Sequence, residues 1–170
     1  MPLRNSKSLV TGMTKSETKQ LFESNNYILE FNGLYRFLSN FYLAVVTYDG
    51  ITYPSSEHAF VAQKTLDVTK RHELVDMMLT PGEAKKYGKK LKLRSDWEAV
   101  KYDIMKGIVK AKFTQNPALL EKLLDTGDKI LVEGNTWGDT IWGVYLGTLC
   151  GKNYLGMILM EVRAECNAKH

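Results

Sequence analysis

The 170-residue sequence is poor in cysteine and has no long apolar run, and both absences narrow the class of protein. Cys150 and Cys166 have neither a CxxC spacing nor the density of a secreted disulfide scaffold. No stretch reaches the roughly 18 apolar residues that a membrane-spanning helix needs, and the first residues lack the apolar core of a signal peptide. We therefore expect a soluble protein in the reducing cytoplasm.

Histidine is also scarce, and this scarcity argues against a metal centre. The three histidines show no paired spacing, so we expect no bound metal and no cofactor. His58 is more typical of a structural residue than of a catalytic acid or base, because no Ser or Cys nucleophile in a recognisable turn accompanies it.

Charge of one sign is not in large excess. Lys and Arg number 23 and Asp and Glu 19, which gives a formal net charge of +4. This balance suits phosphate-bearing ligands and does not require nucleic acid. The nearest feature to a basic stripe is the segment 85–94, which is equally compatible with a solvated helix end.

The chain has a hydrophobic content of 44% and a charged content of 25%, which are typical of a globular protein. Residues 1–26 are polar and predict an N-terminal extension, with a possible short helix after Ser16. Residues 27–170 predict one compact α+β domain that is mainly helical. Two β-rich runs flank Asp49 and Gly50, a strong hairpin signal that predicts a small antiparallel sheet.

Local signals place the other elements. After Pro54 the sequence becomes mainly helical. Ser55 is the predicted N-cap of the first helix. Three further helices are predicted before residue 129: one from Pro81 to about Gly88, one from a capping box at 95–98 to about Phe113, and one from Pro117 that stops at Gly127. After them we predict a strand at 129–135, a glycine-rich loop at 137–153 and a terminal helix at 155–166.

The first of these helices carries an unusual mixture of charges. Glu57 and Lys64 are seven residues apart and therefore share one helix face. In one interpretation Glu57 complements the helix dipole and Lys64 is solvated; in the other both side chains line a cleft. Trp97, in the first turn of the long helix, is either a stacking surface or a core residue.

The segment 133–143 adds Glu133, Asp139, Trp137 and Trp142 within a flexible backbone. Acids that meet across a pocket would suit hydrolysis of a glycosidic bond, and an aromatic ring would hold the departing base by stacking. Spacing alone does not separate such an enzyme from a nucleotide-binding module.

An ordered series of motifs resembles the NADAR family, also called the YbiA-like family, over about residues 31–163. The motifs are FLSNF at 37–41, Gly50 with YP at 53–54, EHAF at 57–60 with Lys64, LRSDWE at 93–98, LLDTGDKILVE at 123–133, Asp139 with WG at 142–143, and GKNYLGMILMEVR at 151–163. The resemblance implies a compact, mainly helical α+β fold and an N-glycosidase.

The resemblance also implies substrates and site residues. Some members of the family cleave the ribosylamine bond of phosphorylated riboflavin intermediates, and others remove ADP-ribose from guanine in nucleic acid. Both substrates remain open here, and nucleic acid is a partner only as an ADP-ribosylated substrate. The expected catalytic residues are Glu57, Asp139 and Lys64. The expected substrate-binding residues are Trp97, Asn40, Ser39, Trp142 and Arg36.

Lys64 has two possible roles, phosphate binding and attack on a ring-opened sugar aldehyde. The segment TLC at 148–150 replaces a part that is often glycine-rich in the family, which bears on substrate choice. The alternative function is a non-catalytic ADP-ribose or nucleotide-binding module, against which the presence of both Glu57 and Asp139 argues.

Overall fold

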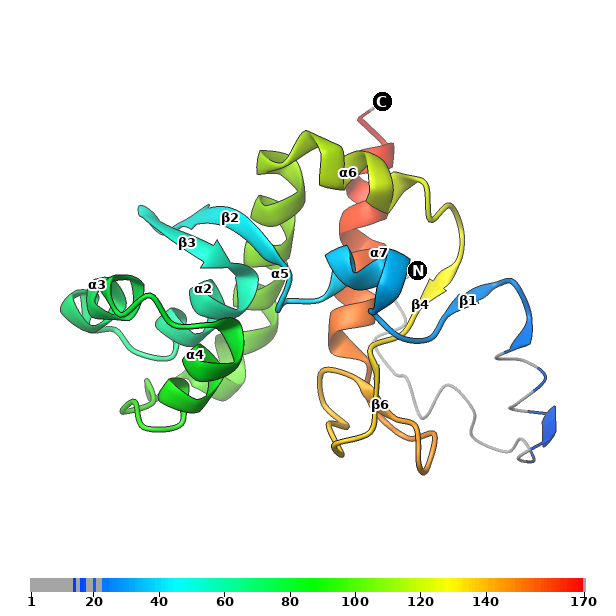
Figure 1. The fold of residues 1–170 in the computed structure, drawn as a ribbon, viewed down its shortest axis with the longest axis horizontal. Helices are drawn as coiled ribbons and strands as arrows, with labels where there is room; N and C mark the ends of the chain where they lie inside the picture. Colours follow the sequence, from blue (N-terminus) through cyan, green and yellow to red (C-terminus); the bar gives the residue numbers. More distant parts are fainter. Residues whose placement is uncertain (1–13, 15, 18–19, 21–22, 170) are drawn as a thin grey trace. The chain divides into compact units, whose positions relative to one another are not determined.

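The computed structural model describes Thr14, Ser16, Glu17, Gln20 and residues 23–169 (Figure 1). Most of the short helix expected after Ser16 lies outside the described residues. The division into an N-terminal extension and a domain at residue 27 stays a prediction.

The chain forms two compact units, which are described in turn. One unit comprises Met1–Arg36 and Thr126–His170, and we call it the terminal unit. The other is Phe37–Asp125, the central unit. Both contain helices and strands, so the predicted α+β class is confirmed. Among the described helices, none has the length and apolar character needed to cross a membrane.

The central unit begins with the predicted hairpin. Strands β2 (Leu43–Tyr48) and β3 (Ile51–Ser55) pair antiparallel, with Thr47 opposite Thr52. Asp49 and Gly50 form the turn with φ angles of 50° and 76°. Positive φ at both positions matches the turn to the twist of the strands, which is why this dipeptide predicted the hairpin correctly.

Five helices follow the hairpin in the central unit. They are α2 (Ser56–Gln63), α3 (Val68–Asp76), α4 (Pro81–Gly88), α5 (Trp97–Gln115) and α6 (Pro117–Leu124). Helix α2 is buried along its whole length and packs against α3, α4, α5 and the hairpin (Figure 1). The functional candidates on α2 are therefore held by the core of this unit.

Most of the helix boundaries follow the predicted signals. Ser55 is the N-cap of α2, and Thr80 forms a capping box with Glu83 at the start of α4. Helix α6 starts at Pro117 as predicted but ends at Leu124, so the predicted end at Gly127 was three residues late.

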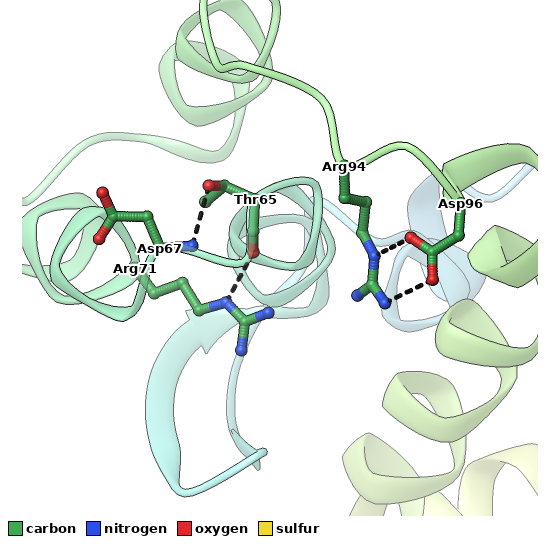
Figure 2. Close-up of polar contacts among 5 residues, drawn as sticks. All are labelled: Thr65, Asp67, Arg71, Arg94 and Asp96. Carbon is green, nitrogen blue, oxygen red and sulfur yellow. Dashed lines mark hydrogen bonds and ion pairs between the residues drawn. The ribbon is translucent and has the colours of Figure 1, made fainter.

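The predicted capping box at 95–98 is wrong. Asp96 is the N-cap of α5 but makes no side-chain hydrogen bond to the helix. Its two carboxylate oxygens instead accept from Nε and Nη2 of Arg94, at 2.6 and 2.9 Å (Figure 2). The predicted box required the Ser95 hydroxyl and the Glu98 carboxylate, but the helix begins one residue later than that motif needs, and Glu98 pairs with Lys101 instead.

The terminal unit contains two short parallel strand pairs and one long helix. The pairs are β1 (Tyr27–Ile28) with β4 (Ile130–Leu131), and β5 (Gly134–Asn135) with β6 (Val144–Tyr145). The segment 129–135, predicted as one strand, therefore forms two strands with different partners. The hairpin signal predicted only an antiparallel sheet, whereas the structure also contains these two parallel strand pairs.

The terminal helix α7 (Tyr154–Asn167) confirms the predicted one. It packs against β4, where Gly156 allows close approach: a Cβ there would lie 2.1 Å from the carbonyl oxygen of Leu131. A short 3-10 helix, η1 (Gly33–Leu38), spans the boundary between the two units in sequence.

Candidate active site

Glu57 lies in the first turn of α2, where backbone groups fix its position. The Ser55 hydroxyl oxygen accepts from the N–H of His58 at 3.2 Å, which starts the helix. The N–H of Glu57 donates to the carbonyl oxygen of Asn40 at 3.1 Å. Glu57 is 8% exposed, and the positive end of the helix dipole favours its ionised form. The structure thus holds a nearly buried carboxylate in a defined place.

The segment 37–41 is the support for this turn. The side-chain oxygen of Asn40 accepts from the Ser56 hydroxyl at 3.0 Å, and its Nδ2 lies 3.4 Å from the sulfur of Met105 in α5. The Ser39 hydroxyl accepts from the N–H of Phe41 at 3.1 Å. Asn40 and Ser39, both expected to bind substrate, are therefore engaged in holding the loop and α2 together.

Lys112 of α5 completes this support, and the sequence analysis missed it. Its ammonium donates to the carbonyl oxygens of Phe37 and Ser39 at 2.6 and 2.9 Å, although the side chain is 1% exposed. The available signal was its spacing, four residues after Ile108 on a face that is otherwise apolar. A lysine in such a position needs buried acceptors.

Lys64 follows directly after α2 and lies in a group of charges. Burial is the main cause that lowers its pKa below 10.5. Lys85 and Lys89 lower the pKa further, whereas Glu57 opposes the change. A Cβ added at Gly88 would lie 3.5 Å from the Lys64 Nζ, so the small residue leaves room for the ammonium. We call Glu57, Lys64, Lys85 and Lys89 the lysine cluster.

His58 has a structural role, as the sequence predicted. Its Nδ1 lies 2.6 Å from the Ser55 hydroxyl, and its Nε2 lies 2.8 Å from the carbonyl oxygen of Leu79. A carbonyl only accepts, so Nε2 carries the proton and Nδ1 accepts from Ser55. Burial lowers the pKa of this ring below 6.5, which favours the neutral form.

Trp97 begins α5 and is 6% exposed. Its ring contacts that of Phe60 in α2, with centroids 4.9 Å apart and the planes inclined by 48°. This contact joins two helices of the core. It favours the packing interpretation of Trp97, while its expected contact with substrate stays a proposal.

Asp139 belongs to the terminal unit, in the segment between β5 and β6. Its Oδ1 accepts from the N–H groups of Ile141 and Trp142, each at 3.0 Å. Asn135, which the sequence analysis did not single out, exchanges hydrogen bonds with the backbone of Asp139 at 2.7 and 3.0 Å. The predicted loop is therefore an ordered turn that presents the Asp139 carboxylate.

The other two candidates also lie in the terminal unit. The ring of Trp142 meets that of Tyr154 edge to face, with centroids 6.0 Å apart. Arg36 is exposed in the last turn of η1. The candidates thus divide between the units: Glu57, Lys64, Trp97, Ser39 and Asn40 belong to the central unit, and Asp139, Trp142 and Arg36 to the terminal unit.

Possible ligands for a metal were also compared with the structure. Within the part of the chain that the structure describes, no three His, Cys, Asp or Glu side chains gather as a metal site requires. Both cysteines are free thiols, Cys150 exposed and Cys166 buried. The absence of a metal from the reaction stays a prediction.

Known proteins resemble this chain along most of its length. The family model for the NADAR domain matches residues 26–167. The N-glycosidase YbiA of Shigella flexneri is 41% identical over 129 residues, which cover 75% of this chain and 79% of that protein. An N-glycosidase of Nostoc punctiforme is 39% identical over 113 residues, covering 64% of this chain and 71% of that protein.

Other similarities concern a longer protein and a solved structure. A riboflavin biosynthesis protein of Vibrio vulnificus is 37% identical over 147 residues, which cover 85% of this chain but 39% of that protein. The NMR structure of the E. coli protein YbiA matches with a TM-score of 0.74 and 37% identity, covering 85% of this chain and 87% of that one.

Proposed function

The chain belongs to the NADAR family and is an N-glycosidase, and we propose that it hydrolyses the bond between a phosphorylated ribosyl unit and a base or amine. The observation that carries the proposal is the lysine cluster, in which the nearly buried Glu57 shares one face of α2 with Lys64, and the charges of Glu57, Lys85 and Lys89 act on the Lys64 ammonium. The carboxylate suits the sugar carbon that becomes cationic, and the ammonium groups suit the phosphate.

The reaction breaks the C1′–N bond, and the electron pair leaves with the nitrogen, which takes up a proton. A water molecule adds to C1′ and gives up a proton. We assign to Glu57 the stabilisation of the positive charge on C1′ and the acceptance of the water proton. Its place at the start of α2 supports this assignment, because the positive end of the helix dipole stabilises a negative charge there.

Lys64 holds the phosphate in this proposal, with Lys85 and Lys89 adding to the positive potential. Partial burial strengthens its attraction for an anion, since the local dielectric is lower than in water. The lowered pKa also makes Lys64 a candidate amine for attack on a ring-opened sugar aldehyde. Reduction with borohydride during turnover separates these roles: a covalent adduct on Lys64 would support amine attack.

Asp139 is proposed as a second catalytic carboxylate. Its Oδ1 is used in the turn, and among the described residues its Oδ2 has no hydrogen-bond partner. Asp139→Asn keeps an oxygen that can accept from Ile141 and Trp142 while it removes the charge. This variant therefore tests the carboxylate without removing the turn.

For the substrate we propose a phosphorylated ribosylamino-pyrimidine of the kind found in riboflavin synthesis. The relative named as a riboflavin biosynthesis protein supports this choice. A second candidate, ADP-ribosylated guanine in nucleic acid, is favoured by the exposed Lys86, Lys90 and Lys92 beside the lysine cluster.

The test incubates the protein with both substrate types and measures the released base by chromatography. We expect release from the phosphorylated ribosylamine, at a rate that EDTA does not change, because ligands for a metal do not gather among the described residues. Release of guanine alone would move the proposal to the nucleic-acid substrate. Saturable binding without any release would support the non-catalytic module instead.

A further inference from the structure

Lys112 is a buried lysine of the central unit, and the proposed function gives it no role. Its side chain is 1% exposed, on a helix whose neighbouring buried residues Ile108 and Phe113 are apolar. Burying a charge costs free energy, and replacing buried ionic groups with apolar side chains of similar size is often neutral or stabilising. Stability alone would therefore not require an ammonium at this position.

The ammonium holds the segment 37–42, which runs from the end of η1 to the start of β2. It donates to the carbonyl oxygens of Phe37 and Ser39 at 2.6 and 2.9 Å. It also lies 5.7 Å from the centroid of the Tyr42 ring, within cation–π range. The Ser39 carbonyl oxygen accepts in addition from the N–H of Tyr42 at 3.2 Å. One charge thus contacts both ends and the middle of a segment that is largely without regular structure.

Helix α5 is a well-anchored support for this lysine. The helix packs against both α2 and β2 (Figure 1). Nδ2 of Asn116, just after the helix, donates to the carbonyl oxygens of Lys112 and Val45 at 2.7 and 3.0 Å, which ties the end of α5 to β2. The rings of Phe37 and Phe113 meet edge to face, with centroids 6.4 Å apart. Lys112 therefore reaches the segment 37–42 from an element that is itself fixed.

The segment in turn determines where Glu57 lies. The carbonyl oxygen of Asn40, one residue beyond Ser39, accepts from the N–H of Glu57 at 3.1 Å and from the Ser56 hydroxyl at 3.4 Å. Because each peptide unit is planar, a displacement of the Ser39 carbonyl is carried to that of Asn40. Loss of the Lys112 contacts would therefore shift the acceptor that fixes the first turn of α2.

We propose that Lys112 is a positioning residue of the N-glycosidase reaction. By holding the segment 37–42, its ammonium keeps the Asn40 carbonyl oxygen, and through it Glu57, in the geometry that the reaction requires. Lys112 itself does not contact the substrate. A misplacement of about 1 Å in a reacting group is enough to cost about a hundredfold in rate. The inference rests on the catalytic role proposed for Glu57 and extends it to the element that places this carboxylate.

The test compares Lys112→Met with Val109→Ala, a control on the same helix. Methionine retains most of the apolar length of lysine but removes the ammonium. We expect kcat for the phosphorylated ribosylamine to fall about ten- to hundredfold and KM to change less than about threefold, because the loss concerns the transition state. Val109 is 1% exposed, so its truncation should lower the melting temperature while kcat stays close to that of the unmodified protein. Equal kcat values for the two variants would overturn the proposal.

A double-mutant cycle shows whether Lys112 acts through Glu57. In Glu57→Gln the carboxylate is already absent, so adding Lys112→Met should lower kcat by less than about twofold. An equal fold-loss in both backgrounds would overturn the proposal, because a general effect on the fold lowers both rates alike. If Lys112→Met does not fold, Lys112→Gln replaces it in the same cycle, since its amide can donate to one carbonyl oxygen. An unchanged rate in Glu57→Gln alone would overturn the catalytic role of Glu57, and with it this proposal.

Discussion

The carbonyl oxygen of Asn40 accepts a hydrogen bond from the N–H of Glu57 at 3.1 Å, so the loop that precedes the hairpin fixes the first turn of α2. The same residue accepts from Ser56 through its side chain. The backbone bond to Glu57 survives substitution of the side chain, as does a longer bond from the Ser56 hydroxyl to the same carbonyl oxygen at 3.4 Å, whereas the side-chain bond to Ser56 does not. Asn40 therefore allows the contribution of this support to be measured.

Asn40→Ala should lower both stability and turnover. It removes the nearer of the two acceptors of the buried Ser56 hydroxyl and leaves the Asn40 carbonyl oxygen at 3.4 Å, so we expect a loss of about 0.5–1.5 kcal/mol, the net contribution of one hydrogen bond. Urea unfolding measures the stability, and base release measures turnover. Asn32→Ala, at an exposed position, is the control. Wild-type behaviour of Asn40→Ala in both assays would show that the side chain does not support the turn.

We expect the folded protein to lose stability in acid because of His58. Its pKa is lowered in the folded protein, so the unfolded chain binds a proton more readily. The stabilising contribution of neutral His58 is therefore complete above about 6.5, the unfolded pKa, and decreases as the pH falls through the lower folded pKa. Melting temperatures measured between pH 8 and pH 5 follow this change.

The control for this prediction is the exposed His72. His72→Gln should retain the pH dependence of the unmodified protein. His58→Gln should melt lower at pH 8, because Ser55 and Leu79 lose a fitted partner, and should show a weaker dependence on pH. The same pH dependence in both variants would contradict the assignment.

Lys64→Met should mainly affect substrates that carry a phosphate. Loss of a charge-assisted hydrogen bond of about 1.5–3 kcal/mol corresponds to a ten- to hundredfold lower kcat/KM for the phosphorylated substrate. The dephosphorylated analogue should change little. In the unmodified enzyme, kcat/KM should decline in alkali at a pH below 10.5, because burial lowers the pKa of the ammonium. Equal losses for both substrates would contradict a phosphate-binding role.

Substitutions of Trp97 distinguish packing in the protein core from stacking on the substrate. Because the ring is buried against Phe60, Trp97→Ala should destabilise the fold by about 3–5 kcal/mol through the cavity that it leaves. Trp97→Phe should lose less. Thermal melts and kinetics of the folded fraction are measured together. An unchanged melt combined with a raised KM would show instead that Trp97 stacks on substrate.

The sequence predicted the elements with strong local signals. The Asp49-Gly50 turn, the Ser55 cap and the Thr80-Pro81 start all depend on a few adjacent residues, and each is present in the structure. The capping box at 95–98 failed because the helix begins at Trp97, which makes Asp96 rather than Ser95 the N-cap, and because Glu98 pairs with Lys101. Local rules do not include such competition.

In the candidate site too, local sequence signals predicted some features, while contacts between residues far apart in the sequence were missed. Motif position and helical spacing selected Glu57 and Lys64 as candidates, and their catalytic roles stay predictions. The support from Lys112 was not predictable, because its two carbonyl acceptors are more than 70 residues away in the sequence. The packing of Trp97 on Phe60 likewise depends on how α2 meets α5.

The most direct measurement of the central claim is the rate of base release by Glu57→Gln from the phosphorylated ribosylamine. The substitution keeps the backbone bond to Asn40 and nearly the same volume but removes the charge. We expect turnover to fall at least about a hundredfold, the effect of removing a positioned acid or base, with an unchanged melting temperature. Glu121→Gln, at an exposed position on α6, should retain full activity. A rate for Glu57→Gln equal to that of Glu121→Gln would contradict the catalytic role of Glu57.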